Sequence, residues 1–484
     1  MPEEIRSDRL RKLKQYRMAA GTAYPERVKV ALPLGEFLRR FTALECEERP
    51  ISVLGRLGSI RNQGGVLFTD IRDEHDRLQL VFMKRTTKQF ALLQDTLDSG
   101  DFLEATGLPG KTKRGEKSLF VRRARIIAKS IRPIPADWYG IEDIETRLRK
   151  RYLDFLAHPE TRELFVKKCA FWDTVRASLK EAGFLEVETP TLELTPGGAE
   201  ALPFITHHNA LDTDFYLRIS LELPLKKLLV GGFLKVFEIG RIFRNEGIDR
   251  EHLQDYTQME CYASYQNYED MMRFTRQMYR KIVKTLFGTL KITVGKETVD
   301  WGKPWPRADY YTVFQKETGL DLATVTVADL MRKAKTLELN LPSCLEKGRL
   351  IDLVYKKAVR PKLRAPCFLV DPPIEVEPLA KRLVRDPQRV ARFQIMALGT
   401  ELGKGFSELN DPLDQRKRFE EQARLRETGD EEAQRLDEDY LEAMEYGMPP
   451  AAGFGMSERL FAVLMAKPIR ETVIFPLMRQ KERQ

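Results

Sequence analysis

The spacing of apolar residues changes about a third of the way along the chain. Residues 5–17 have the pattern of a basic helix that ends near Gly21 and Pro25. From about residue 51 to residue 131, short segments instead alternate apolar and polar residues or run apolar, and glycines or charged residues separate them. Five such strands within so short a stretch predict a small β-barrel.

A longer region with both helices and strands follows a proline-containing linker. Residues 160–183 have apolar side chains at helical spacing and end at a glycine, after which strands recur to about residue 263. These strands mix polar and apolar residues, as in an antiparallel sheet with one face lining a cavity. We expect helices at 268–288, 414–446 and 457–466, a small helical insertion near 296–347, and a return to strand at 394–411.

The predicted fold class is therefore α+β, with two domains. Residues 1–145 would form the basic helix and a five-stranded barrel of the oligonucleotide-binding (OB) type. Residues 146–484 would form a domain built on a mostly antiparallel sheet flanked by helices.

Excess positive charge is confined to the first part of the chain. Residues 1–150 hold 30 lysines and arginines against 21 acidic residues, whereas residues 151–484 hold 51 of each. A basic module on a neutral body suggests that the module binds a polyanion. The same excess could equally serve only to keep the module in solution, so charge by itself leaves both interpretations open.

Neither the cysteines nor the apolar segments indicate secretion or a membrane anchor. The five cysteines lie far apart without a Cys-x-x-Cys pair, so neither a zinc knuckle nor a disulfide framework is predicted. No apolar run approaches the ~20 residues that a transmembrane helix needs, and residues 1–16 lack the apolar stretch of a secretory signal. We therefore expect a cytoplasmic protein with free thiols.

Three segments of the second domain resemble the three motifs of class II aminoacyl-tRNA synthetases. They are the helix and strand ending at Pro190, the segment FRNEGIDREHLQDYTQMECY at 243–262, and GFGMSERLFAVL at 453–464. Each is weak alone, but all three occur in order behind a basic barrel. The sequence between these motifs resembles the lysyl-tRNA synthetase family in particular, for example in TPGGAEALPFITHHNALDTDFYLRIS and GFSELNDPLDQ. This resemblance extends over nearly the whole chain.

The resemblance implies a homodimeric enzyme that uses ATP and Mg²⁺ to join L-lysine to tRNA(Lys). The lysine carboxylate would attack the α-phosphate of ATP, and the terminal ribose hydroxyl of the tRNA would then take the lysyl group. Because a carboxylate is already ionised at neutral pH, the first step needs in-line placement and charge neutralisation rather than a base. No Ser-His or Cys-His nucleophile pattern stands out in the sequence, which agrees with this chemistry.

Arginines and carboxylates carry the implied ATP site. The expected catalytic residues are Arg244, whose guanidinium fork would bridge the α-phosphate and the substrate carboxylate, and Arg459, which would cover adenine near a helix N-terminus. The motif context favours these roles over surface ion pairs, whereas a loop histidine is more often merely solvated. The ATP-binding residues implied by the resemblance are Arg244, Glu246, His252, Tyr256, Glu401 and Arg459.

A candidate amino-acid pocket follows from strand alternation. Gln258, Glu260 and Tyr262 should share one face of a strand whose opposite face is apolar. A carboxylate beside a phenol can receive an ammonium group. The lysine-binding residues implied by the resemblance are Glu222, Glu260, Tyr262, Phe406 and Glu408.

Each of these side chains has an implied role. Glu222 would hold the α-amino group, Phe406 would pack on the aliphatic stem, and the other three would surround the ε-ammonium. Glu401 and Glu408 are the implied Mg²⁺ ligands, because a phosphate-bound Mg²⁺ takes oxygen donors. The alternative for every acid is a buried structural ion pair.

Two positions depart from the family pattern. Gln394 stands in place of an acid and Lys404 in place of an asparagine. Gln394 removes a charge that would help to hold Mg²⁺, although its carbonyl oxygen can still ligate. A fixed cation at Lys404 would repel a bound lysine unless a carboxylate intervened. Either Lys404 pairs with an acid or the pocket prefers another amino acid; the acids of the pocket favour the first.

The barrel is expected to read the anticodon. OB barrels stack unpaired bases on aromatic side chains along a basic groove. The anticodon-binding residues implied by the resemblance are Phe68, Gln79 and Arg56. The alternative for Phe68 is a place in the barrel core.

Two other functions stay open. A related enzyme could lysylate another acceptor, such as a translation factor or a lipid, although such acceptors do not need the barrel. A catalytically inactive relative could only bind RNA, but Arg244, Glu246, Glu401 and Arg459 would then serve no purpose. Lysine-dependent ATP–pyrophosphate exchange separates the inactive relative from both enzymes, and tRNA charging separates the two enzymes from each other.

Overall fold

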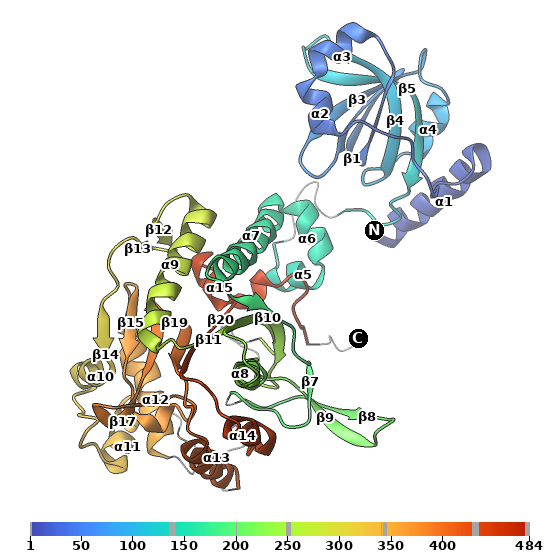
Figure 1. The fold of residues 1–484 in the computed structure, drawn as a ribbon. Helices are drawn as coiled ribbons and strands as arrows, with labels where there is room; N and C mark the ends of the chain where they lie inside the picture. Colours follow the sequence, from blue (N-terminus) through green and yellow to red (C-terminus); the bar gives the residue numbers. More distant parts are fainter. Residues whose placement is uncertain are drawn as a thin grey trace. The chain divides into compact units, whose positions relative to one another are not determined.

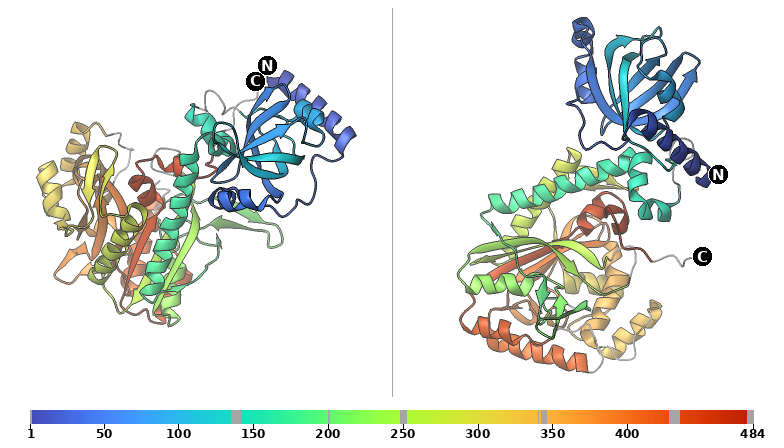
Figure 2. Two further views of the ribbon diagram at one scale, coloured as in Figure 1. Left: turned by 90° about the horizontal axis from the view of Figure 1, so that it is seen from above. Right: turned by 90° about the vertical axis from the view of Figure 1, so that its right-hand side faces the viewer.

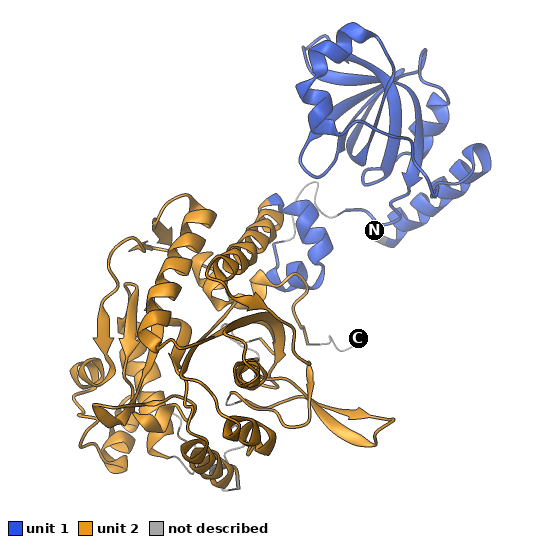
Figure 3. Cartoon of the chain, in the orientation of Figure 1, with its two compact units in different colours: residues 1–159 blue, residues 160–484 orange. Residues whose placement is uncertain are grey.

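The computed structural model describes residues 2–134, 142–199, 201–247, 253–339, 341, 346–427 and 435–479. The chain divides into two compact units, residues 1–159 and 160–484, each with its own core (Figure 3). Helices α5 (Ile144–Arg149) and α6 (Arg151–Ala157) belong to the first unit. The first unit thus continues past residue 145.

The first unit is built on a closed five-stranded barrel in the order β1-β2-β3-β5-β4 (Figure 1). Neighbouring strands are antiparallel, except that β3 and β5 are parallel. Alternate residues such as Leu78 and Leu80 fill the interior, so the period-two pattern produces the core. The predicted barrel is confirmed, with strands β1 (Ile51–Gln63), β2 (Val66–Arg72), β3 (Arg77–Met83), β4 (Phe102–Lys111) and β5 (Lys117–Ala128).

Four helices accompany the barrel strands. They are α1 (Pro2–Ala20), α2 (Leu34–Arg39), α3 (Phe41–Glu47) and α4 (Phe90–Thr96). The predicted basic helix at 5–17 is confirmed as part of α1. Leu13 and Tyr16 of α1 are buried in the core of the barrel unit, so this basic helix also has a structural role.

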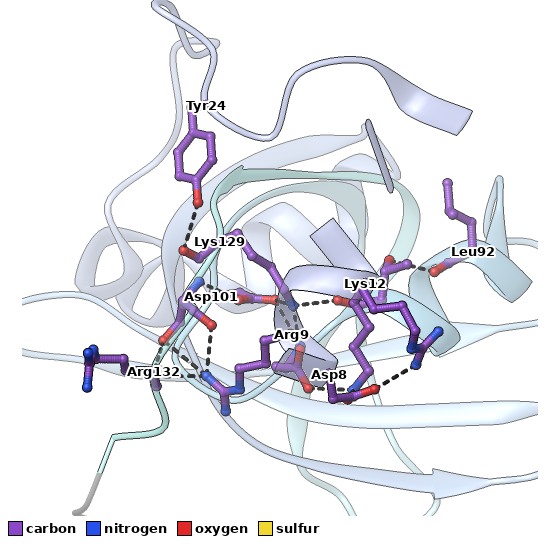
Figure 4. A network of polar contacts seen from close by, with 12 residues as sticks. Asp8, Arg9, Lys12, Tyr24, Leu92, Asp101, Lys129 and Arg132 are labelled. Carbon is purple, nitrogen blue, oxygen red and sulfur yellow. Dashed lines mark hydrogen bonds and ion pairs between the residues drawn. The ribbon is translucent and has the colours of Figure 1, made fainter. Parts of the chain in front are cut away.

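A buried ionic cluster joins α1 to the barrel (Figure 4). We call it the Lys129 cluster, comprising Lys12, Asp98, Asp101 and Lys129. The Lys129 ammonium donates to Asp98 at 2.6 Å, to Asp101 at 2.8 Å and to the Thr96 carbonyl at 2.6 Å. Lys12 donates to the other Asp98 oxygen at 2.7 Å and also pairs with the more exposed Asp8 at 3.0 Å.

The second unit is built on an eight-stranded sheet in the order β14-β15-β18-β19-β20-β11-β10-β6. Only the outer pairs, β14 with β15 and β10 with β6, are parallel, so the predicted mostly antiparallel sheet is confirmed. The central strands are β18 (Arg392–Ala397), β19 (Thr400–Ser407), β20 (Ala451–Ser457), β11 (Asp255–Ser264) and β10 (Lys235–Phe243). The outer strands are β14 (Arg307–Asp309), β15 (Cys367–Val370) and β6 (Leu185–Glu186).

Helices cover both faces of this sheet. On one face, α7 (Pro159–Glu181) and α9 (Tyr268–Phe287) share a core with Met259 and Cys261 of β11. On the other face lie α8 (Glu222–Val230), α13 (Pro412–Glu427) and α14 (Glu438–Glu445). In the right-hand view of Figure 2, the sheet is seen between α7 and α13. The predicted helix at 268–288 is confirmed by α9.

Several local predictions were wrong in detail. The insertion near 296–347 is not purely helical, because it begins with strand β13 (Glu297–Asp300), which pairs with β12 (Lys291–Val294), and then adds β14 to the main sheet. Its helices are α10 (Tyr310–Thr318), α11 (Val327–Thr336) and α12 (Lys347–Val354). By contrast, the predicted helical stretch at 414–446 is confirmed and contains two helices, α13 and α14.

One predicted strand lies outside the main sheet. The segment FYLRIS contributes to β9 (Thr213–Leu217), which joins β7 (Leu192–Glu193) and β8 (Ile205–His208) in a separate small sheet. In the part of the chain that the structure describes, no helix is long and apolar enough to cross a membrane.

Candidate active site

The polar face of β11 carries a fixed carboxylate. Tyr262 donates its hydroxyl to Glu260 Oε2 at 2.7 Å. The other oxygen of Glu260 accepts from the Ser220 hydroxyl at 2.8 Å and from the Leu221 backbone amide at 3.1 Å. The predicted alternation is confirmed, since Met259 and Cys261 lie in the core on the opposite face. Glu260 therefore has a defined orientation, set by neutral donors.

A second group of charges lies where α8 meets the end of β19. The Lys226 ammonium donates to Glu222 Oε1 at 2.6 Å and forms an ion pair with Glu408 Oε2. We call Glu222, Lys226 and Glu408 the Lys226 cluster. Lys226 and Glu408 have no exposed side-chain surface, and Glu222 is 7% exposed. Lys226 was not among the predicted site residues. Its position four residues after Glu222, which places the two side chains on one face of a helix, was the available signal.

Aromatic rings enclose the Lys226 ammonium. The ring centroids of Phe406 and Tyr262 lie 5.4 Å and 6.0 Å from its nitrogen. The structure thus brings together the five expected lysine-binding residues around an internal ammonium. They are Glu222, Glu260, Tyr262, Phe406 and Glu408.

Burial makes ionisation difficult within this group. It raises the pKa of Glu222 to about 7, although the Lys226 ammonium opposes the shift. Burial also holds the pKa of Glu408 well above its ordinary value, again against the attraction of Lys226. The pKa of Lys226 is raised because Glu222 and Glu408 outweigh the opposing effect of its burial. The cluster therefore favours an additional cation.

One carboxylate oxygen of the Lys226 cluster lacks a hydrogen-bond donor among the described residues. Among the described residues, Glu408 Oε1 is buried without a hydrogen-bond partner. A buried charged oxygen without a donor is costly, which points to a ligand. Gly453 on β20 leaves space beside it, because a Cβ at this position would lie 2.4 Å from Glu408 Oε1 and 2.4 Å from the Tyr262 ring.

Three expected ATP residues, Arg244, Tyr256 and Arg459, lie toward the other end of the sheet from Glu408. Arg244, directly after β10, donates from its side chain to the Ile219 carbonyl at 3.3 Å, and its guanidinium lies 5.8 Å from the Tyr256 ring centroid. Glu246 follows two residues later, and its carbonyl accepts from Gln254 at 3.3 Å. His252 lies outside the described residues.

Arg459 is the first residue of α15 (Arg459–Leu464), the predicted final buried helix. Its backbone amide donates to the Ser457 hydroxyl at 3.3 Å. Ser457 is paired with Gln258 across β20 and β11, so the third motif adjoins the strand of the pocket. A guanidinium at this position is suited to an anionic ligand bound beside the sheet.

The two departures from the family pattern face each other. Gln394 on β18 is directly opposite Lys404 on β19. The Gln394 amide donates to Glu401, and Lys404 pairs with Glu377 at 3.0 Å. Arg392 lies 3.4 Å from the same Glu377 carboxylate. Lys404 is thus paired with an acid, as the first of the two alternatives requires.

The oxygen donors around Glu401 are suited to a Mg²⁺ ion that binds together with the phosphates of ATP. They are less suited to a metal ion held by protein side chains alone. Glu401 and Gln394 are neighbours, so a carboxylate and an amide oxygen are available together. Glu408, the other expected Mg²⁺ ligand, is already paired with Lys226. Within the described ranges, no group of three or more acidic, histidine or cysteine side chains could hold a metal ion.

The expected anticodon residues lie on the outer side of the barrel. Phe68 is half-buried, while its neighbours Leu67 and Thr69 are buried, so Phe68 is not a core residue. Gln79 accepts from the Ser118 hydroxyl at 2.9 Å. The Arg56 guanidinium stacks over the Phe102 ring, 4.3 Å from its centroid.

Comparisons with known proteins agree with this geometry. A family model described as tRNA synthetases class II (D, K and N) matches residues 143–479, and one described as an OB-fold nucleic acid binding domain matches residues 51–127. A lysine–tRNA ligase of Roseiflexus sp. (strain RS-1) is 42% identical, covering 99% of both chains. A lysine–tRNA ligase of Moorella thermoacetica is 42% identical over 99% of this chain and 98% of its own. One from Chloroflexus aurantiacus is 40% identical over 99% of both.

Proposed function

This chain belongs to the lysine–tRNA ligase family of class II tRNA synthetases, and on that premise we propose that it activates L-lysine with ATP and transfers the lysyl group to the 3′ end of tRNA(Lys). The observation that carries the proposal is the open oxygen of buried Glu408 beside the Glu260–Tyr262 pair. Buried carboxylates with unused acceptor capacity are suited to an ammonium ligand.

Lysine binding would use both acid groups of the pocket. The ε-ammonium would lie between Glu408 Oε1, Glu260 and Tyr262, and the α-amino group would lie near Glu222. The aliphatic stem would pack on Phe406, which is 4% exposed. Because all these side chains are buried, their interactions with a bound ammonium are little screened by water.

Activation would depend on charge neutralisation. The lysine carboxylate attacks the α-phosphorus of ATP, the bond to the bridging oxygen breaks, and pyrophosphate leaves. Arg244 would hold the attacking carboxylate and the α-phosphate together, and Arg459 would bind the outer phosphates. The Tyr256 ring would stack on adenine, and Glu246 would accept a hydrogen bond from the adenine amino group. His252 would lie near the triphosphate. Glu401 would hold the Mg²⁺ ion that neutralises phosphate charge, with Gln394 as a further oxygen donor.

The barrel would bind the anticodon of tRNA(Lys). Phe68 offers a half-exposed ring for stacking, and Gln79 offers an amide for a base edge. Phe68→Ala should weaken tRNA charging by about tenfold and leave lysine-dependent pyrophosphate exchange unchanged. A Phe68→Ala variant that loses both activities equally would show that Phe68 supports the fold rather than the RNA.

We also propose that two copies associate through α7 and the strands that follow it. Large apolar side chains are exposed there, including Val166 (61%), Leu185 (50%) and Leu192 (44%). Sedimentation equilibrium should give twice the mass of one chain, and Val166→Glu should shift the equilibrium toward the monomer. A monomeric wild type at micromolar concentration would contradict this assembly.

The first experiment is ATP–pyrophosphate exchange with each of the twenty amino acids, followed by tRNA charging. Exchange with lysine alone, together with charging of tRNA(Lys), is the expected result. Exchange without charging would favour a different acceptor for the lysyl group. No exchange with any amino acid would favour an RNA-binding protein without catalytic activity.

A further inference from the structure

Lys226 bridges two acids that come from distant parts of the chain. Glu222 lies in the first turn of α8, and Glu408 directly follows β19. The ammonium donates to Glu222 Oε1 at 2.6 Å and is ion-paired with Glu408 Oε2. A single side chain therefore determines how far apart these two carboxylates lie.

We propose that Lys226 is a positioning residue that sets the distance between Glu222 and Glu408, and thereby the length of the diamino acid that the pocket accepts. This inference rests on the proposed function, in which the α-amino group of lysine binds near Glu222 and its ε-ammonium near Glu408. The bridge leaves Glu408 Oε1 to the substrate, because Lys226 pairs with the other oxygen.

Packing fixes the bridge in place. Leu225 and Leu229, on either side of Lys226 along α8, lie in the core that α8 forms with β10 and β11. The Phe406 and Tyr262 rings enclose the ammonium, and Tyr262 is itself tied to Glu260 at 2.7 Å. A supporting residue with so little freedom can hold its partners within a narrow range of positions.

Charge balance suits the same role. Glu222, Glu260 and Glu408 bring three carboxylates into one buried region, and Lys226 offsets one of them. Two negative charges then remain for the two ammonium groups of a diamino acid. Without Lys226, Glu222 and Glu408 would repel each other, and their spacing would no longer be defined.

Ornithine, which is one methylene shorter than lysine, is the natural probe of this spacing. A pocket that engages both ends of its ligand discriminates against a missing methylene by about 10–200-fold. If Lys226 sets the spacing, then changing its length or charge should reduce that discrimination. A residue that merely supported the fold would weaken the use of both amino acids equally.

The experiment compares lysine and ornithine in pyrophosphate exchange with the full chain, using wild type, Lys226→Arg, Lys226→Met and the control Lys227→Met. Lys227 is the next residue of α8 and pairs with the exposed Asp439.

In both Lys226 variants, the ratio of kcat/KM for lysine to that for ornithine should fall about tenfold or more. The KM for lysine should rise while kcat at saturating lysine stays within about threefold, and the control should match wild type. Thermal melting checks folding, and Lys226→Arg, which keeps the charge, decides the matter if Lys226→Met does not fold.

The outcomes separate this inference from the proposed function. A wild type inactive with lysine overturns both. An active wild type whose lysine-to-ornithine ratio is unchanged in Lys226→Arg overturns the positioning role and leaves the proposed function intact. Equal losses for the two amino acids in Lys226→Arg also overturn it, because they indicate only structural support.

Discussion

Each unit of the chain holds a fully buried lysine ammonium between two carboxylates, and the two clusters differ in how completely their carboxylates are paired. In the Lys129 cluster, Lys129 donates to two carboxylates and a carbonyl, and Lys12 adds a second cation. In the Lys226 cluster, one ammonium faces Glu222 and Glu408, and Glu260 lies nearby. Asp98 and Asp101 of the first cluster have donors on their oxygens, whereas Glu408 of the second keeps an oxygen without one among the described residues.

This difference distinguishes a structural cluster from a binding site. Burial of a charge is tolerated when its partners and hydrogen bonds are complete, as they are around Lys129. Around Lys226, Glu408 keeps a buried oxygen without a donor among the described residues. Two buried lysines with similar exposure can thus serve different purposes, and the unsatisfied group indicates which one awaits a ligand.

The largest expected loss of lysine binding comes from filling the space beside Glu408 Oε1. Gly453→Ala would place a Cβ 2.4 Å from Glu408 Oε1, where the lysine ammonium is proposed to bind. We expect kcat/KM for lysine in pyrophosphate exchange to fall at least about 100-fold. Gly65→Ala in the barrel, where a Cβ meets nothing within 4 Å, is the control. Normal lysine use by Gly453→Ala would contradict the proposed position of the ammonium.

The Lys129 cluster should respond in stability rather than in substrate use. Lys129→Met removes the ammonium and leaves Asp98 and Asp101 buried with an incomplete set of partners, which should destabilise the barrel by about 3–5 kcal/mol. Urea unfolding followed by circular dichroism should reveal this loss, whereas Lys84→Met, at an exposed barrel lysine, should not. The KM for lysine in pyrophosphate exchange should stay unchanged. A large rise in that KM would remove the distinction between the clusters.

The two clusters should also differ in their pH dependence. Burial raises the pKa of Glu222 from 4.5 to about 7. The protonated form of Glu222 therefore stabilises the folded unit at low pH, and this stabilising effect is lost as pH rises from about 4.5 through 7. Because an ammonium ligand needs the ionised form, the KM for lysine should fall between pH 6 and about pH 8. In the Lys129 cluster, burial would raise the pKa of Asp98, but hydrogen bonds from Lys12 and Lys129 lower it below 3.8. The stabilising effect of ionised Asp98 is therefore lost only as pH falls below about 3.8, whereas burial raises the pKa of its neighbour Asp101. A lysine KM that is constant from pH 6 to about pH 8 would contradict the Glu222 assignment.

The smallest expected effect concerns Lys404. Its ammonium pairs with Glu377 at 3.0 Å, but the Lys404 side chain is 44% exposed, and Arg392 remains beside Glu377 when Lys404 is replaced. Lys404→Asn should therefore change the KM for lysine by at most about fivefold. Pyrophosphate exchange with all twenty amino acids would detect a change of preference. A variant that used a different amino acid would show that Lys404 sets specificity.

Much of the fold follows from local patterns in the sequence. Period-two alternation predicts the barrel and separates the core face of β11 from the face that carries Glu260 and Tyr262. The helix α9 is predicted by apolar spacing, and it ends at Gly288, which adopts φ 73°. The insertion after residue 296 contains predicted helices, but its strand β14 was missed, because this short strand is stabilised by pairing with the distant β15 rather than by its own sequence.

The chemistry of the site was only partly predictable. Motif resemblance identified Glu222, Glu260 and Glu408 as a group, but Lys226 was missed, and its place beside Glu222 was established by the helix α8. Nothing local connected Lys226 to Glu408, or Lys404 to Glu377, since those contacts join separate segments of the chain. Lys404 and Gln394 were recognised as departures, but strand register placed them opposite each other, and the partner of Lys404, Glu377, came from a separate segment.

The sequence by itself determined the elements, their apolar faces and the residue types available for chemistry, because periodicity and motifs are local properties. Only the tertiary structure decided which charges are buried together and which remain incomplete. Lys129 and Lys226 are the same residue type, yet one is fully satisfied and the other lies among excess carboxylates. The physical reason is that desolvation and pairing depend on neighbours brought in by folding, and these neighbours set the energy of every buried charge.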